Sequence, residues 1–272
     1  MDDMWSNHEP MDSADTPTDT VCTHPSYRPR RKHPTAEELA AESMAADMEK
    51  WITYIPGDND DSTSEPFSQW LANNLPSQLS RTDGIGRIAV AAPGYNIMDD
   101  ALEDLIGAQE SWEQLKACGR PINLRTITDI AKVHSVIRGK WLFYTSTGLK
   151  VDHLWSLVAQ GVVEGRCGIS ATVTPYNPHD ESGSHVIGVY NNNFTDYEQV
   201  MDLEHAVRLL GIKCQMMYKP IIYSKLGIYS NNEWGLQPSV YKSVYDIVKC
   251  CSRVMELTRS SHMPSHAGDQ PL

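Results

Sequence analysis

The sequence predicts an α+β fold in which an antiparallel sheet carries helices on one face. Two segments, 167–175 and 185–191, alternate apolar and polar residues with the period of two that is typical of strands, and a short turn joins them. Two other segments, 150–165 and 195–210, repeat apolar residues at the spacing of an amphipathic helix. Because a short turn joins antiparallel strands, whereas parallel strands need a long crossover, the hairpin favours an antiparallel sheet over a parallel, doubly wound one.

The first helix is marked by a capping box, Thr35-Ala36-Glu37-Glu38, whose hydroxyl and carboxylate bind free N–H groups at a helix start. We expect this helix to run to about Trp51. Apolar spacing and end signals place the other helices at 66–75, 99–118, 124–138, 150–165 and 195–210. Strands are expected at 86–91, 140–146, 167–175, 185–191, 212–219 and 224–230. After about Ser243 the sequence predicts only a weak helix.

The chain has 272 residues, of which 40% are hydrophobic, and this suits one domain with unstructured ends. Residues 1–34 are rich in Asp, Ser, Thr, Pro and His. They lack the apolar surface that would offset the chain entropy lost on folding, so we expect a disordered N-terminal tail. The domain is expected from 35 to 243, and residues 244–272 are expected to form the weak helix and a disordered C-terminal tail.

The net charge of -12 argues against non-specific binding to nucleic acid, because such binding depends on Lys and Arg neutralising phosphates. The charge is unevenly distributed. Residues 130–242 contain ten Lys and Arg against nine Asp and Glu, so the acidity belongs to the rest of the chain. A local phosphate site therefore remains compatible with the second half of the sequence.

No apolar stretch reaches the roughly 18 residues that span a bilayer, and residues 1–4 are acidic, unlike the start of a signal peptide. We therefore expect a cytoplasmic, intracellular protein with no membrane partner. The basic cluster at 28–33 leaves two alternatives open, a nuclear address or solvated charge in a tail. The six cysteines are scattered and form no Cys-x-x-Cys pair, so we expect reduced thiols, no metal and no cofactor.

A set of motifs between about 35 and 243 resembles one known family. The motifs are residues 35–48, Gly139-Lys140-Trp141-Leu142, residues 162–166, Phe194-Thr195-Asp196, Gly211-Ile212-Lys213-Cys214, Tyr218-Lys219-Pro220 and Leu226-Gly227-Ile228-Tyr229. Through them the chain is similar to the basophilic leukaemia-expressed protein family, an uncharacterised group. The resemblance implies a curved antiparallel sheet backed by helices, similar to the fold of the cap-binding translation initiation factor 4E.

The same resemblance implies where the chain departs from that factor. Gly139-Lys140-Trp141-Leu142 resembles its Gly-Arg-Trp-Leu strand, Val151-Asp152-His153-Leu154-Trp155 its Leu-Asp-Arg-Phe-Trp helix, and Cys167-Gly168 the start of its next strand. A Trp-Glu pair that binds methylated guanine precedes the strand in the factor, but residues 129–138 contain neither residue here. The positions of the factor's phosphate-binding cations correspond to residues near Thr174, Tyr176 and Ser184, none of which is cationic. Cap recognition of the known type is therefore not expected.

Candidate binding residues lie at the ends of the predicted elements. Five cations, Lys140, Lys150, Arg166, Lys213 and Lys219, are candidates for converging on a phosphate, and the alternative is that they cap carbonyls or face water. Three indoles, Trp141, Trp155 and Trp234, are candidates for stacking on a base. For Trp141 and Trp155 the alternative is a place in the core, since Trp in an alternating strand or an amphipathic helix usually packs there.

The sequence contains no convincing catalytic group. Asp152 and His153 are adjacent on a helix, so their side chains point about 100° apart and do not form an acid–base pair. Cys167 and Cys214 have no histidine placed beside them by spacing. We therefore predict a non-enzymatic binding protein that binds RNA or a nucleotide on the concave face of the sheet. The alternatives are a protein-interaction module that uses its helical face and an unrecognised hydrolase.

Overall fold

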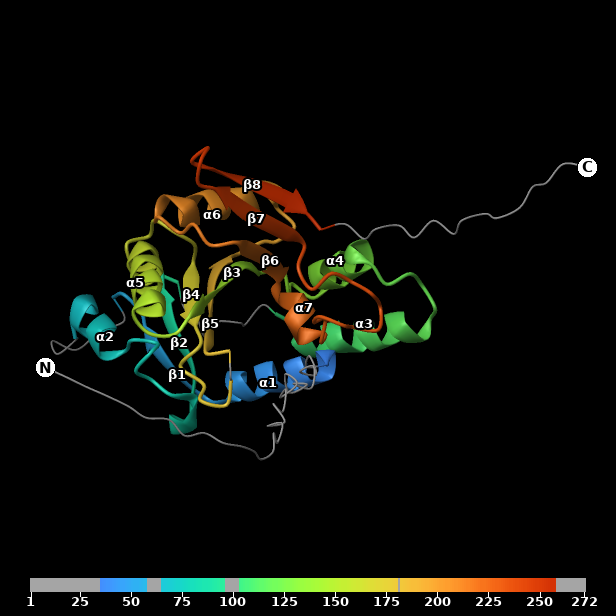
Figure 1. Ribbon diagram of the computed structural model, residues 1–272. Coiled ribbons are helices and arrows are strands. Elements are labelled where there is room, and N and C mark those ends of the chain that lie inside the picture. Colours follow the sequence, from blue (N-terminus) through green and yellow to red (C-terminus); the bar gives the residue numbers. More distant parts are fainter. Residues whose placement is uncertain (1–34, 58–64, 96–102, 181, 258–272) are drawn as a thin grey trace, which may run out of the picture. The chain divides into compact units, whose positions relative to one another are not determined.

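The computed structural model describes residues 35–57, 65–95, 103–180 and 182–257 (Figure 1). The chain divides into two units, Met1–His33 and Pro34–Leu272. The first unit lies outside the described residues, and so do the predicted tail at 1–34, the basic cluster within it and the last residues, 258–272. The elements described below all belong to the second unit.

The described residues form one eight-stranded sheet, which is curved and does not close on itself (Figure 1). Its strand order is β1-β2-β4-β5-β3-β6-β7-β8. The strands are β1 (Lys50–Tyr54), β2 (Ile85–Ala91), β3 (Gly139–Ser146), β4 (Ser170–Val173), β5 (Ser184–Asn191), β6 (Met216–Pro220), β7 (Tyr241–Asp246) and β8 (Cys251–Glu256). The pair β1 and β2 is parallel, and the other pairs in this order are antiparallel. The predicted α+β class is confirmed, with a parallel edge added to the predicted antiparallel sheet.

Helices lie on both sides of this sheet. They are α1 (Ala36–Met48), α2 (Phe67–Asn73), α3 (Leu105–Ala117), α4 (Leu124–Val133), α5 (Leu149–Val163), α6 (Tyr197–Leu209) and α7 (Ile221–Lys225), with a 3-10 turn, η1, at Arg81–Asp83. The helices α5 and α6 back the convex face, α1 and α7 lie on the concave side, and α3 packs against α4 (Figure 1). Within the described part of the chain, no helix has both the length and the apolar character needed to cross a bilayer.

The two faces of the sheet carry different side chains because successive residues of a strand point to opposite sides. On β3, Trp141 and Phe143 are fully buried against the helical side, and the indole N–H of Trp141 donates to the carbonyl of Val200 in α6 at 2.8 Å. Lys140 alternates with them, so it points to the concave side. Much of the core therefore lies between the sheet and α5 and α6, and on the concave face charged residues such as Lys140 alternate along the sheet with apolar ones such as Leu142.

Two predicted elements at the concave side differ from the structure, the first in its end and the second in its presence. The capping box of Thr35 is present, but the helix ends at Met48 because Glu49 is extended, and Trp51 lies in strand β1. The strand predicted at 224–230 is absent, because Ile221 to Tyr223 form the helical turn α7 directly after Pro220. The helical turn includes Ser224 and Lys225, so the first residues of the predicted strand are helical.

The weak helix predicted after Ser243 is also wrong. Residues 241–256 form the antiparallel hairpin of β7 and β8 instead. The hairpin is joined to α6 by a buried ion pair, in which Glu204 and Arg208 lie 2.8 Å apart and both bond the hydroxyl of Ser243. These contacts are non-local, so the local sequence gives little sign of them.

Candidate anion-binding site

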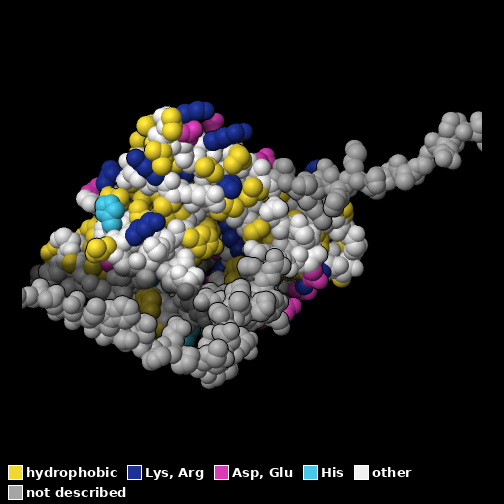
Figure 2. Space-filling view, in the orientation of Figure 1, with side chains coloured by type: hydrophobic (Ala, Val, Ile, Leu, Met, Phe, Trp, Pro, Cys, Tyr) yellow, Lys and Arg dark blue, Asp and Glu magenta, His cyan; other side chains and the backbone are white. Residues whose placement is uncertain are grey.

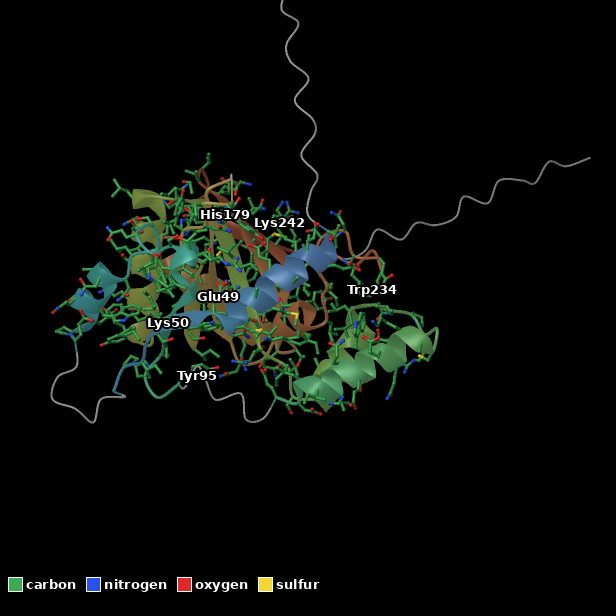
Figure 3. The ribbon with its side chains drawn as sticks, turned by 90° about the horizontal axis from the view of Figure 1, so that it is seen from below. Glu49, Lys50, Tyr95, His179, Trp234 and Lys242 are labelled. Carbon is green, nitrogen blue, oxygen red and sulfur yellow. The ribbon has the colours of Figure 1, made fainter. Side chains whose placement is uncertain are left out.

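A cavity of about 420 Å³ lies on the concave face of the sheet, between its strands and the helices α1 and α7. We call it the concave-face cavity. It is lined by Ser43, Asp47, Glu49, Trp51, Arg87, Arg138, Lys140, Ser170, Thr172, Tyr190, Ile221, Ser224 and Lys225. Glu49, at the junction of α1 and β1, is labelled in Figure 3. The lining side chains come from five strands, two helices and the segment before β3, so long-range folding is needed to assemble the site.

A row of residues in register crosses four strands at this face. Ser170 of β4 lies opposite Tyr190 of β5, Tyr190 lies opposite Lys140 of β3, and Lys140 lies opposite Lys219 of β6. Directly opposed residues of neighbouring strands point to the same face of a sheet, so the four side chains lie side by side. We call these four residues the cross-strand row.

Gly188 makes room for the Lys140 side chain. A Cβ atom at this position would lie 3.3 Å from Cδ of Lys140 and 3.7 Å from Oγ1 of Thr172. The first distance is tighter than ordinary carbon contacts, so any larger residue would push the lysine aside. The strand β5 thus provides a small residue beside the cation and an aromatic one, Tyr190, under it.

The two lysines of the row are opposed like charges, which destabilise a sheet when they face each other directly. The Lys140 ammonium lies 3.3 Å from the Tyr190 hydroxyl and 5.1 Å from the centre of its ring. The Lys219 ammonium lies 3.7 Å from the centre of the Tyr229 ring. Neither amine has a carboxylate partner among the described residues. The fold therefore holds two adjacent amines that no carboxylate of the described residues contacts.

The crowding of these cations shifts the pKa values of the row. Lys219 is only 6% exposed, and its burial, together with the charge of Lys140, lowers its pKa to about 7. Burial raises the pKa of Tyr190, but the charges of Lys140 and Arg87 and the hydrogen bond with Thr172 outweigh it, so the net shift is downward. The shift of Lys219 reflects its burial first and the charge of Lys140 second, whereas the net shift of Tyr190 reflects the cations beside it.

The remaining charges of the cavity are largely paired. Asp47 of α1 lies 4.0 Å from Arg87 and 3.3 Å from Lys225. Arg138 binds Glu103 at 2.6 Å and donates to the hydroxyl of Tyr95, which Figure 3 labels. A second lining carboxylate, Glu49, lies 3.4 Å from Arg81, outside the lining. The surplus positive charge of the cavity is therefore concentrated at Lys140 and its neighbour Lys219.

Trp51 contributes an aromatic face at the other side of the cavity. It lies opposite Arg87 in the parallel pair of β1 and β2. Its indole N–H is buried and has no hydrogen-bond partner among the described residues. Burying such a donor unpaired costs about 1–3 kcal/mol, which an acceptor on a ligand would recover. The cavity thus combines a cation that lacks a carboxylate partner, Lys140, with an aromatic side chain whose donor has no partner among the described residues.

Two of the five predicted cations, Lys140 and Lys219, are brought together in the cross-strand row, and of these Lys140 lines the cavity. The other three lie elsewhere. Lys150 is exposed on α5, Arg166 follows α5 and pairs with Glu164 at 2.5 Å, and Lys213 lies 5.7 Å from the centre of the Tyr245 ring. They lie at element ends on other parts of the surface and face solvent or local partners.

None of the predicted indoles lines the cavity. Trp141 and Trp155 are fully buried on the helical side, so the prediction that they stack on a ligand is wrong, and the core alternative holds. Trp234, labelled in Figure 3, packs edge-on against Trp112 of α3 with ring centres 4.7 Å apart. The cavity uses Trp51 instead, which sequence reasoning placed at the end of a helix.

Arg87 and Tyr190 were also missed, although a signal for both exists in the sequence. Arg87 alternates with the apolar residues Ile88 and Val90, and Tyr190 alternates with Val189. Polar residues that alternate with apolar ones along a strand point to the face that does not join the core. A thiol nucleophile gains no support, because burial raises the pKa of Cys167 to about 12.

The chain is similar to one protein family and, over part of its length, to solved structures. The family model for basophilic leukemia-expressed protein Bles03 matches residues 109–230, which confirms the resemblance seen in the sequence. Among solved structures, schistosome eIF4E complexed with m7GpppA and 4E-BP is similar at a TM-score of 0.31 and 14% identity, over 39% of this chain and 58% of that one. C. elegans eIF4E-3 with the 4E-binding protein Mextli and a cap analog is similar at a TM-score of 0.27 and 18% identity, over 33% of this chain and 53% of that one. The chain thus spans little more than half the length of these proteins.

Proposed function

We propose that this protein binds single-stranded RNA or a nucleotide in the concave-face cavity, without catalysing a reaction there. The observation that carries the proposal is the pair Lys140 and Lys219, which face each other across β3 and β6 with no carboxylate partner among the described residues. A phosphate beside them would favour the charged form of both amines and offset their mutual repulsion.

The rest of the lining supports a phosphorylated ligand with a planar group. Trp51 offers an indole face and a donor without a partner, and Tyr190 offers a hydroxyl between Lys140 and Thr172. Stacking of a base on an aromatic side chain contributes about 1–3 kcal/mol and tolerates every base. Cap recognition of the type found in initiation factor 4E is not part of this proposal, because the residues that perform it are missing from 129–138.

The proposal is tested by measuring RNA binding at several salt concentrations. Fluorescence anisotropy of a labelled oligouridylate gives the affinity of the parent and of Lys140→Gln, which keeps a polar side chain but loses the charge. If the ammonium contacts one phosphate, the slope of log K against log salt falls by about 0.7 in the variant, and all sequences weaken alike.

Lys150→Gln and Lys213→Gln are the matched controls, since both remove an exposed lysine that does not line the cavity. Neither is expected to change the slope. A folded Lys140→Gln protein that binds RNA with the parental affinity and slope would dispose of the proposal.

Protein interaction through the helical face is the second candidate. Leu149 of α5 is 90% exposed and Leu209 of α6 is 73% exposed. In Figure 2, however, the hydrophobic side chains on the face that includes α5 and α6 are separated by polar and basic ones. Continuous apolar surface is the usual mark of a protein interface, so the cavity remains the better-supported site.

A further inference from the structure

Away from the concave-face cavity, α3 and α4 hold a serine, a histidine and an aspartate in one hydrogen-bonded chain. The hydroxyl of Ser111 lies 2.8 Å from Nε2 of His134, and Nδ1 of the same ring lies 2.7 Å from Oδ2 of Asp104. Ser111 comes from the middle of α3, Asp104 caps the start of α3, and His134 caps the end of α4. This connectivity, serine to imidazole to carboxylate, is that of a nucleophile with its base and an orienting acid.

The protonation of the chain follows from the carboxylate. A hydrogen bond from the backbone N–H of Gly107, and then the bond to His134, lower the pKa of Asp104. The ionised carboxylate only accepts hydrogen bonds, so Nδ1 of His134 carries the proton that it donates to Asp104. In the neutral ring Nε2 is then an acceptor, and the Ser111 hydroxyl donates to it. This is the tautomer in which an imidazole takes a proton from a serine.

The local backbone is adapted to this arrangement. A Cβ atom at Gly107 would lie 2.1 Å from Oδ2 of Asp104 and 2.6 Å from two atoms of the His134 ring, so only glycine leaves room for their contact. Glycine destabilises a helix relative to alanine. Ser135, the residue after the histidine, has a φ of 58°, a conformation that costs energy for residues other than glycine. Two unfavourable local features thus flank the imidazole.

Helix capping explains part of this network but not all of it. Asp104 caps α3 through Oδ1, which accepts from Gly107, and this bond needs no histidine. The backbone N–H of Asp104 donates to the carbonyl of His134, which already joins the two helices. The bond from Ser111 to Nε2 serves neither cap, so it requires a separate explanation.

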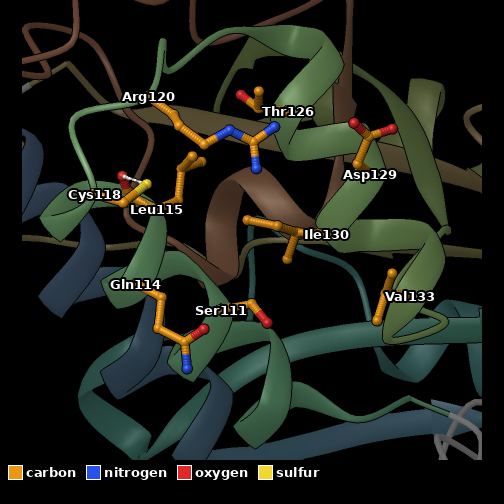
Figure 4. A pocket seen from close by; sticks show the side chains of 9 residues that line it. All are labelled: Ser111, Gln114, Leu115, Cys118, Arg120, Thr126, Asp129, Ile130 and Val133. Carbon is orange, nitrogen blue, oxygen red and sulfur yellow. Dashed lines mark hydrogen bonds between the residues drawn. The ribbon is translucent and has the colours of Figure 1, made fainter.

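Ser111 opens onto a pocket of about 460 Å³ between α3 and α4 (Figure 4). Leu115, Ile130 and Val133 give the pocket an apolar side, and Arg120 extends over it from the loop that follows α3. Gln114 and Arg120 also line it, and neither side chain has a hydrogen bond or ion pair within the described residues. The pocket therefore offers apolar surface for an acyl chain, and Gln114 and Arg120 place polar donors on its lining.

From this geometry we infer that Ser111 is an acyl-accepting nucleophile and that the pocket hydrolyses small esters with an apolar acyl group. Oγ of Ser111 bonds to the carbonyl carbon while its proton passes to Nε2 of His134. The bond from the carbon to the leaving oxygen breaks, and the imidazolium returns the proton to the departing alcohol. Water, deprotonated by His134, then attacks the acyl-serine and releases the carboxylic acid and Ser111.

The inference is tested with the full-length protein and a fluorophosphonate reagent, which phosphonylates activated serines. Peptide mapping by mass spectrometry should locate the label on Ser111, and Ser111→Ala should abolish both the label and hydrolysis of a p-nitrophenyl butanoate. Ser68→Ala, which removes an exposed serine of α2, is the matched control and should change neither. His134→Gln should slow labelling by about 100-fold to 10,000-fold, the usual contribution of a general base.

Asp104→Asn separates a positioning role from helix capping. Asparagine caps a helix about as well as aspartate, so the melting temperature should stay close to that of the parent. The neutral amide no longer fixes the ring tautomer, so the labelling rate should fall by about 10,000-fold at neutral pH. If Ser111 of the folded parent reacts no faster than serine in a short peptide, the three residues only join the helices and the inference fails.

Discussion

Lys219→Met is expected to stabilise the protein at neutral pH, and the gain should shrink as the pH rises. In the fold, burial and the charge of Lys140 lower the pKa of Lys219 from 10.5 to about 7. The unfolded chain therefore binds more protons than the folded one between about pH 7 and pH 10.5, and the stability of the parent rises with pH across this range. Below pH 7 both states are protonated, and the full cost of burying the charge is present.

The magnitude follows from the size of the pKa difference. One pKa unit corresponds to about 1.4 kcal/mol, so the buried amine costs about 5 kcal/mol well below pH 7, about 4 kcal/mol at pH 7 and about 2 kcal/mol at pH 9. Methionine has a similar length and no charge, and it gives up only the contact with the Tyr229 ring, which contributes about 1–2 kcal/mol. The variant should therefore be a few kcal/mol more stable than the parent at pH 7, and this difference should narrow by about 2 kcal/mol by pH 9.

Urea unfolding of both proteins at pH 6, 7, 8 and 9 measures the difference directly. Lys213→Met is the control, because this lysine is exposed and its removal should leave the two curves parallel. If the curves of the parent and Lys219→Met are also parallel from pH 7 to pH 9, the amine is not held at a lowered pKa and the reasoning about the cavity charge is wrong.

Two further predictions concern the tryptophans and the cap. Trp141→Ala should lower the free energy of unfolding by about 3–5 kcal/mol, because it removes a fully buried indole and its hydrogen bond to Val200. Urea unfolding measures this loss, and a clearly smaller value would contradict the prediction. A 7-methylguanosine resin should not retain the protein specifically, and retention that survives a wash with unmethylated guanosine nucleotide would contradict this.

The strands and helices whose side chains alternate or repeat clearly were predicted from the sequence. The elements whose formation depends on tertiary contacts were not. The helix α5 and the hairpin of β4 and β5 were predicted from periodicity alone. The hairpin of β7 and β8 was missed because Ser243 and Ser252, through which it bonds Glu204 of α6, lie 39 and 48 residues from that glutamate. A single sequence contains no sign of such a contact.

The candidate site shows the same limit. Lys140 and Lys219 were both predicted as binding residues, but their pairing depends on the register of β3 against β6. The sequence places each lysine at the edge of an apolar segment, where solvation is the commoner outcome, as it is for Lys150. The triad of Ser111 was missed because its members are 7 to 30 residues apart on two helices, and only the packing of α3 on α4 joins them.

The spacing of groups across the sheet favours a ligand longer than one phosphate. Lys140 lies on β3 and Arg87 lies on β2, with β5 and β4 between them, so the two strands are about 14 Å apart at the usual spacing of 4.8 Å. Trp51 lies one strand farther. Inorganic phosphate would engage the Lys140 end alone, whereas a dinucleotide could place a phosphate there and a base near Trp51. A dinucleotide should therefore displace labelled RNA at a much lower concentration than phosphate does. Equal displacement by both would confine the site to Lys140 and Lys219 and leave Trp51 outside it.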